Sequence, residues 1–438
     1  MKRSSRLFLL LALVAVFIIS WIVVLGAETP DQKQAELIRQ AGDYMGDGIY
    51  VLAAPLLEEA IDINASRTVE AENMLKRAYL EMMGQTGVSR KYLDLLDKQM
   101  GRGDAGPEAF AEAAGFHLDR SRFAEAYAVL RAGIAKTQSR ELSAMYEGSR
   151  YEYTTGYNAY EDVTRTFGST IGVCRDGRWG IARADGTLFI PCEYDKVSTF
   201  SDDRAVVKNG ALIYAVDRNN NRLALSKANA SDFGNLANDR VPLLIDGKWY
   251  RATGEFVVGS TAFDWIGTYS GGYAAAQLNG KWGVVDLSVN WIVPPEYDGV
   301  ATDELGRSYA QGAVFVKRGG AAYLFVDGAQ TGEAYEDACP FGSEGYAAVK
   351  KNGKWGFIDV SGEVKIDFRF DEALSFGQHL AAVRQGELWG YVSLYGVLVI
   401  DPVFLQAKSF SNGSAPVLTD IGWRFITLIE YRAEGGLM

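Results

Sequence analysis

The chain has 438 residues, of which 48% are hydrophobic and 23% charged, and its formal net charge is -11. This composition is typical of globular proteins, and the length predicts more than one domain. No basic cluster follows the first six residues, and a protein that neutralises phosphates needs one, so the sequence argues against a nucleic-acid partner. Three cysteines are too few for a disulfide framework here, and we expect Cys174, Cys192 and Cys339 to be small buried side chains.

An apolar segment at the N-terminus predicts a membrane anchor. Residues 7–27 carry no charge and follow a short basic stub, residues 1–6. About 20 apolar residues span the hydrocarbon core, whereas the apolar region of a signal peptide has about 7–15. Leu25 is bulky where cleavage after Ala27 would prefer a small residue, so we favour an uncleaved signal anchor over a cleaved signal. The positive-inside rule then places the basic stub in the cytoplasm and residues 28–438 outside it.

Residues 28–157 show the apolar period of α-helices. Leu57 and Ala60 belong to one such stripe, and Gly-rich breaks separate the helices in the manner of helix pairs. The stretch PEAFAEAAGFHLDRSRFAEAYAVLRAGIAK, residues 107–136, resembles a tetratricopeptide repeat. The resemblance implies a helical-repeat domain with a concave surface that binds peptides or packs on a neighbouring domain. A plain helical bundle that acts as a spacer fits the same residues.

Residues 158–438 form an array of about eight similar units. Each unit has one marker position, and the markers recur at a near-regular interval of roughly 34 residues, which predicts a repeat array. Six markers are tryptophans and two weaker copies have tyrosine instead: Trp179, Tyr214, Trp249, Trp282, Tyr323, Trp355, Trp389 and Trp423.

Each unit has the pattern of a small antiparallel β-sheet. In the sixth unit, Asn352-Gly353 is the strongest short signal for a two-residue hairpin turn. The return strand alternates, with Trp355 on one face and Gly356 on the other. Gly356 leaves space for a bulky neighbour across its backbone, and the tryptophan of the next unit is our candidate. An isolated hairpin is marginal in water, so we expect the units to stack with the tryptophans as the core between them.

The motif Lys-Trp-Gly-x-x-Asp, followed by Tyr-Asp and a Phe-containing turn, resembles the WG-repeat family found in many bacterial proteins. The resemblance covers about residues 160–430, although only four of the copies keep the Trp-Gly pair. It implies a shared scaffold and no particular reaction, and it implies a bacterial source.

The points within a unit at which the array begins and ends indicate whether the array closes into a ring. The array begins with Tyr160 and Phe167, which form only the tail of a unit, and it ends before any equivalent tail. The N-terminal fragment could therefore complete the last unit, as a propeller requires. An open β-solenoid fits the same sequence, but we favour a propeller-like ring.

The sequence predicts no catalytic residues, no metal site and no cofactor. The two histidines, His117 and His379, have no cysteine at a ligand-like spacing, and no Gly-rich loop bridges a strand to a helix. Acidic residues recur at fixed positions of the units, where Asp favours turns, so we expect them to be structural. These residues are Asp195, Asp286, Asp298, Asp359 and Asp371.

A binding site should interrupt the repeat. Two interruptions stand out, a long insertion in the fifth unit and the loop of residues 215–235. We expect both to be binding loops on one edge of the array, although tolerated insertions are an equal alternative. The candidate residues are Asp303, Glu304 and Arg307 in the first and Asn219 and Asn220 in the second.

Together these features favour a non-enzymatic, extracytoplasmic scaffold that is held in the membrane and binds a protein or a cell-wall polymer. An envelope glycan or peptide hydrolase is the alternative, and it needs two acidic side chains that leave the repeat register and converge. A purely structural spacer is a third possibility.

Overall fold

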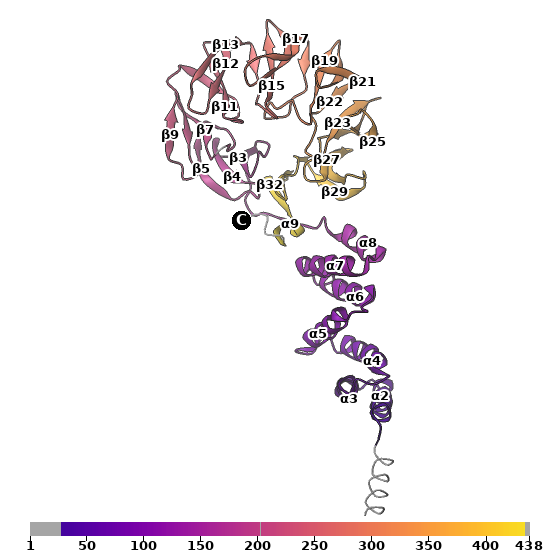
Figure 1. Ribbon diagram of the computed structural model, residues 1–438. Helices are drawn as coiled ribbons and strands as arrows, with labels where there is room; N and C mark the ends of the chain where they lie inside the picture. The colour runs from indigo at the N-terminus through magenta and orange to yellow at the C-terminus, as the bar shows by residue number, and fades with distance from the viewer. Residues whose placement is uncertain (1–27, 202, 434–438) are drawn as a thin grey trace, which may run out of the picture. The chain divides into compact units, whose positions relative to one another are not determined.

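The computed structural model describes residues 28–201 and 203–433 (Figure 1). Its contacts divide the chain into two compact units, with the division between Tyr146 and Glu147. The predicted cytoplasmic stub and membrane anchor, within residues 1–27, lie outside the described residues. Among the described residues, no helix is both long enough and apolar enough to cross a membrane.

The N-terminal unit is helical, as the sequence predicts. Its first helix begins with a capping box, in which the Gln32 N–H donates to the Thr29 hydroxyl at 3.2 Å and the Thr29 N–H donates to Gln32 Oε1 at 3.0 Å. The helices are α2 (Pro30–Gly46), α3 (Tyr50–Ile63), α4 (Thr68–Glu81), α5 (Val88–Gly101), α6 (Pro107–Leu118), α7 (Phe123–Thr137) and α8 (Arg140–Ser149), and the division between the two units falls within α8. From α2 to α7, each helix packs against the next.

The apolar stripe predicted for α3 forms part of the helical core. Ala53, Leu57 and Ala60 are fully buried on one face of this helix. One buried charge accompanies them: the Glu72 carboxylate is almost completely buried and accepts a hydrogen bond from Arg102 Nη1 at 2.9 Å. A buried carboxylate needs such a partner, so Arg102 has a structural role at the end of α5.

The second unit is a closed ring of eight four-stranded antiparallel sheets within the described residues (Figure 1). In seven of these blades, four consecutive strands follow one another across the sheet, and the eighth blade takes its last strand from the N-terminal side of the ring. The eight-bladed propeller is therefore confirmed over the open solenoid.

The strands are as follows. Blade 1 has β2 (Asp162–Val163), β3 (Thr170–Arg175), β4 (Arg178–Arg183) and β5 (Leu188–Tyr194); blade 2 has β6 (Lys196–Val197), β7 (Ala205–Asn209), β8 (Leu212–Val216) and β9 (Arg222–Leu225). Blade 3 has β10 (Ala230–Phe233), β11 (Arg240–Ile245), β12 (Lys248–Thr253) and β13 (Val258–Phe263); blade 4 has β14 (Trp265–Ile266), β15 (Tyr273–Leu278), β16 (Lys281–Asp286) and β17 (Trp291–Tyr297). Blade 5 has β18 (Gly299–Val300), β19 (Ala313–Arg318), β20 (Ala321–Val326) and β21 (Ala329–Tyr335); blade 6 has β22 (Asp337–Ala338), β23 (Tyr346–Lys351), β24 (Lys354–Asp359) and β25 (Val364–Phe370). Blade 7 has β26 (Glu372–Ala373), β27 (Leu380–Gln385), β28 (Leu388–Ser393) and β29 (Leu398–Phe404); blade 8 has β30 (Gln406–Ala407), β31 (Ser414–Thr419), β32 (Gly422–Leu428) and β1 (Tyr153–Thr155), and α9 (Ile429–Ala433) follows it.

Strand β1 closes the ring. It pairs with β32 in antiparallel register, with Thr155 opposite Ile426. Just beyond it, the Gly156 N–H donates to the Phe425 carbonyl at 2.8 Å. The boundary expected between residues 157 and 158 falls after this strand, whereas the structure places β1 in blade 8. A three-residue strand shows no alternating run, so the sequence pattern did not reveal it.

In the six blades that have a marker tryptophan, this tryptophan packs against the following blade. Trp355 of blade 6 shares an apolar cluster with Val383 of blade 7, and Trp423 of blade 8 shares one with Val173 of blade 1. Each blade thus removes from water the aromatic surface that its neighbour cannot bury alone. The same relation to the next blade holds for Trp179, Trp249, Trp282 and Trp389.

The glycine after the tryptophan has a different neighbour from the one expected. A Cβ atom at Gly356 would lie 2.7 Å from the Ile366 carbonyl oxygen, on β25 of the same blade, and not against the next tryptophan. The pairing of β24 with β25 shifts register between Trp355 and Phe357, so a bulge brings the fourth strand across the glycine. The equivalent positions behave alike at Gly180, Gly283 and Gly390.

We predict that Gly356→Ala lowers the free energy of unfolding by about 2 kcal/mol, because the new methyl group meets backbone that cannot move without breaking the sheet. Urea denaturation of the full chain, followed by tryptophan fluorescence, measures this change. Gly148→Ala is the matched control, since a Cβ at Gly148 in α8 meets no described atom within 4 Å. Equal stability of the two variants would contradict the bulge contact.

Candidate functional site

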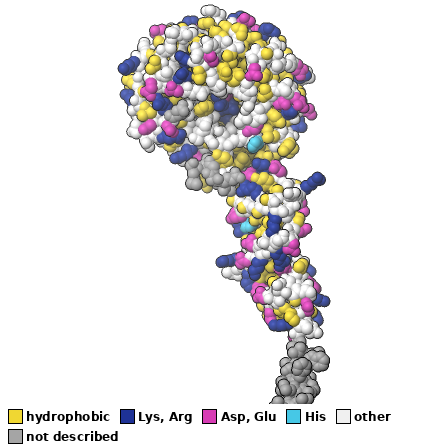
Figure 2. All heavy atoms as spheres, in the orientation of Figure 1, with side chains coloured by type: hydrophobic (Ala, Val, Ile, Leu, Met, Phe, Trp, Pro, Cys, Tyr) yellow, Lys and Arg dark blue, Asp and Glu magenta, His cyan; other side chains and the backbone are white. Residues whose placement is uncertain are grey.

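The short first strand of each blade leads into a loop at the centre of the ring. In most blades this loop holds a hydroxyl residue followed by an aromatic one, for example Thr199-Phe200 and Ser409-Phe410. The aromatic rings of Phe200 and Phe410 are buried, and the hydroxyl groups of Thr199 and Ser409 link neighbouring blades. Thr199 Oγ1 donates to Asn235 Oδ1 at 2.9 Å, and Ser409 Oγ donates to the Ser375 carbonyl at 3.2 Å. Figure 2 shows Lys or Arg side chains within the hollow at this centre.

The insertion in blade 5 is the longest of these central loops, and we call residues 301–312 the channel loop. Asp303 organises it: its Oδ1 accepts hydrogen bonds from the backbone N–H groups of Leu305 at 2.9 Å and Arg307 at 3.0 Å. Its Oδ2 accepts from Arg307 Nε at 2.7 Å. The carboxylate thus fixes a compact turn, as Asp does elsewhere in short loops.

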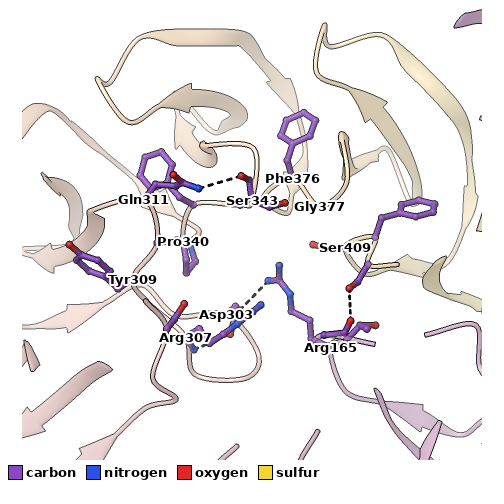
Figure 3. Close-up of a pocket in the computed structure, with 18 residues that line it drawn as sticks. Arg165, Asp303, Arg307, Tyr309, Gln311, Pro340, Ser343, Phe376, Gly377 and Ser409 are labelled. Atoms are coloured by element: carbon purple, nitrogen blue, oxygen red, sulfur yellow. Dashed lines mark hydrogen bonds and ion pairs between the residues drawn. The ribbon is translucent and has the colours of Figure 1, made fainter. Parts of the chain in front are cut away.

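The channel loop spans the centre of the ring. Asp303 Oδ2 lies 3.3 Å from Arg165 Nη1 of blade 1, which is opposite blade 5 in an eight-membered ring. Glu304 Oε2 lies 2.5 Å from Lys408 Nζ of blade 8, and the Thr268 N–H of blade 4 donates to a loop carbonyl at 3.0 Å. Figure 3 shows the Arg165 side chain extended toward Asp303. The loop therefore occupies the channel and connects to three other blades.

A cavity of about 300 Å³ lies beside the channel loop, and we call it the channel pocket. Its lining includes Arg165, Thr166, Asp303 and Arg307 as well as residues of blades 4, 6, 7 and 8 (Figure 3). A second cavity of about 350 Å³ is lined by Glu304 and by the first strands of blades 2 to 4. The loop thus contributes Asp303 and Arg307 to one cavity and Glu304 to the other.

The two segments proposed as binding loops differ in their position. Asp303, Glu304 and Arg307 lie together in the channel. Asn220 lies in the turn between β8 and β9 near the rim, where its Oδ1 accepts from the Tyr194 hydroxyl at 2.6 Å, and the N–H of Asn219 donates to the Asp217 carboxylate. Both segments connect strands at the same end of their sheets, and so share a face of the ring, but the structure does not bring them together.

Two site residues were missed by sequence reasoning. Arg165 and Lys408 precede the hydroxyl-aromatic pair of their blades, where blades 2, 3 and 4 have Ser198, Gly234 and Gly267. A comparison of these central segments among the eight units would have revealed a cation at this position in blades 1, 5 and 8, where blades 2, 3 and 4 have a small residue. The conspicuous Trp-Gly motif lies elsewhere in each unit and gives no such signal.

The recurring acids join blades. Asp371, at the end of blade 6, accepts from Lys354 Nζ at 2.5 Å and from the Gly386 N–H of the next hairpin at 2.7 Å. The hydrogen bonds from Lys354 and Gly386 lower the pKa of Asp371. The same pairing of a lysine or arginine and the next hairpin is made by Asp195, Asp264 and Asp298.

A second set of acids shapes turns within the blades. Asp359 Oδ1 accepts from the N–H groups of Ser361 at 2.9 Å and Glu363 at 3.1 Å, and Asp286 makes the equivalent turn. Burial opposes the ionisation of Asp359, but hydrogen bonds from Ser361 and Lys365 prevail and lower its pKa to about 2. Within the described residues, no group of three His, Cys, Asp or Glu side chains is arranged to hold a metal ion.

The sequence of the ring matches a family model, that of the WG containing repeat, in six segments. These are residues 179–212, 252–282, 282–320, 334–355, 355–389 and 389–420. The ring is a WG-repeat domain. Its channel loop lies inside the third matched segment, so the insertion belongs to a WG repeat and does not separate two of them.

Among solved structures, the WG-repeat ring is similar to several at low sequence identity. Hsv2p of Kluyveromyces lactis is 9% identical over 53% of this chain and 92% of its own, with a TM-score of 0.38. A eukaryotic initiation factor is 10% identical over 65% and 88%, with a TM-score of 0.39. The Cps50 (Swd1) β-propeller domain of Myceliophteria thermophila is 11% identical over 55% and 99%, with a TM-score of 0.34. TM-scores below 0.5 support no statement about function. No curated protein matches the chain in sequence.

We predict that the WG-repeat ring loses stability in acid through its blade-joining aspartates. The pKa values of Asp264, Asp298 and Asp371 are lowered in the folded state by lysine and backbone donors, so their contribution is present above the unfolded pKa, near 4. It disappears as the pH falls from about 4 toward the lowered folded values. Thermal melts of the full chain between pH 7 and pH 2 measure this loss.

The triple variant Asp264→Asn, Asp298→Asn, Asp371→Asn should melt earlier than the native chain at pH 7, while its melting temperature should fall less between pH 4 and pH 2. Substitution of the exposed Asp401 by Asn serves as the control. An unchanged pH profile in the triple variant would show that these carboxylates do not join the blades.

Proposed function

We propose that the protein is a non-enzymatic scaffold of the cell envelope that binds a protein or a cell-wall polymer on the face of its WG-repeat ring that carries the channel loop, which we call the channel face. In this proposal, residues 7–27 anchor the chain in the membrane and residues 28–438 lie outside the cytoplasm. The charge pattern of residues 1–27 supports the orientation, and the uncharged length of the apolar segment supports the anchor.

The observation that carries the proposal is the channel loop. It is the part of the ring where the repeat is most clearly interrupted, and it gathers Asp303, Glu304 and Arg307 at the centre of one face. Loops held on a rigid scaffold are where binding surfaces usually form. The blade-joining acids, in contrast, are engaged within the fold, as expected of residues that every unit requires.

Hydrolysis is the second candidate because Asp303 and Glu304 leave the repeat register and lie at the channel. However, the Asp303 side chain is only 6% exposed and accepts three hydrogen bonds in addition to its ion pair with Arg165. Glu304 is paired with Lys408. Both carboxylates thus serve contacts within the protein, whereas a general acid and base must reach the scissile bond. We therefore rank hydrolysis below binding.

A pull-down from detergent-solubilised envelopes tests the proposal, with residues 28–438, 28–146 and 147–438 as baits. We predict that the bait of residues 147–438 retains a specific partner, and that Glu304→Ala on the channel loop weakens its retention at least fivefold. Lys227→Ala is the control because Lys227 is exposed in a loop between blades, at the opposite end of the strands.

Equal retention by the Glu304→Ala and Lys227→Ala baits would contradict binding at the channel face. If no bait enriches a protein, sedimentation with purified cell wall decides between the remaining possibilities. Co-sedimentation without release of fragments supports polymer binding, whereas release of soluble glycan or peptide fragments supports the hydrolase.

A further inference from the structure

The channel pocket contains more positive than negative charge. The two guanidinium groups of Arg165 and Arg307 share the carboxylate of Asp303, with N–O distances of 3.3 Å and 2.7 Å. All three side chains are mostly buried, with exposed fractions of 20%, 22% and 6%. The single carboxylate of Asp303 balances only one of the two guanidinium charges. Among the described residues, one positive charge therefore remains without a partner, in a place where water is scarce.

Arg165 is the less satisfied of the two. Arg307 Nε donates a hydrogen bond to Asp303 Oδ2, and Asp303 Oδ1 already accepts from the backbone N–H groups of Leu305 and Arg307. In the part of the chain that the structure describes, the guanidinium of Arg165 donates no hydrogen bond and has only the ion pair at 3.3 Å. A guanidinium has five N–H donors, so the N–H groups of Arg165 lack hydrogen-bond acceptors among the described residues. A ligand could supply these acceptors.

Among the residues that the structure describes, no other neighbour of Arg165 supplies the balancing charge. Burial raises the pKa of the Cys339 thiol, which lies near Arg165, to about 12, so this thiol is neutral at physiological pH. Glu304 is engaged by Lys408. Thr166 also lines the pocket, and its buried hydroxyl has no hydrogen-bond partner among the described residues. A surplus cation and an unpartnered hydroxyl thus line the same small cavity.

We propose that the channel pocket binds a small oxyanion, the carboxylate or phosphate group of a ligand, between Arg165 and Arg307, with Thr166 as a further donor. The planar fork of a guanidinium matches the paired oxygens of both groups. A cavity of about 300 Å³ admits such a group with only a small substituent. The proposal goes beyond the scaffold function, because a soluble ion can bind here whether or not the channel face binds a partner.

The experiment titrates the full chain, held in detergent micelles, with inorganic phosphate in one arm and succinate in the other. Sodium chloride keeps the ionic strength constant, and isothermal titration calorimetry measures binding. We expect saturable binding of at least one probe with one site per chain. Arg165→Gln should weaken it at least tenfold, because it removes a charged hydrogen-bond donor pair. Arg178→Gln is the control, since Arg178 pairs with Asp195 outside the channel pocket, and it should bind as the native chain does.

Binding of phosphate alone or of succinate alone identifies whether the pocket takes a phosphate or a carboxylate group. Binding of both probes shows that the pocket accepts either group. Absence of saturable binding in both arms would overturn the proposal, as would equal affinity in the native chain and Arg165→Gln. If Arg165→Gln loses its near-ultraviolet circular dichroism, Arg165→Lys replaces it, since it keeps the charge and removes the fork. Unweakened binding by Arg165→Lys would then overturn the proposal.

Discussion

The pairing of β1 with β32 is the constraint on which the β unit depends. Without it, β32 would be an edge strand with unpaired N–H and C=O groups, and blade 8 would have three strands. Closure also brings blade 8 against blade 1, so that Trp423 packs on Val173 just as every other marker tryptophan packs on the next blade. A strand from before the first repeat thereby completes the burial of the last one.

Closure also creates the candidate site. Arg165 and Asp303 belong to opposite blades, and Lys408 is 104 residues from Glu304 in sequence. Only a ring brings these side chains to one centre, where the channel loop is held by blades 1, 4 and 8. The repeated parts of the units form a rigid frame, and the channel loop carries the candidate binding residues Asp303, Glu304 and Arg307. This division of roles is common in folds whose function resides in loops.

Much of the fold was predictable because its signals are local. The interval between tryptophans gave the number of units, and the incomplete units around Tyr160 and Trp423 predicted closure. The neighbour of Gly356 was not predictable, because it depends on a register shift within the sheet. The channel-loop residues were found as an interruption of the repeat, whereas Arg165 and Lys408 lie in central loops without an insertion and were therefore missed. Their position within the unit, and not their residue type, distinguishes them from surface cations.

Cross-linking of β1 to β32 tests the closed ring most directly. Thr155 and Ile426 lie opposite each other in the β1–β32 pair, at a separation that a disulfide can bridge. In the full chain, Thr155→Cys with Ile426→Cys should form this disulfide under mild oxidation, as detected by peptide mass spectrometry. The mismatched pair Thr155→Cys with Thr419→Cys should not, because Thr419 is on β31. Failure of the matched pair to cross-link in the folded chain, or equal cross-linking of both pairs, would contradict the closure of the ring by β1.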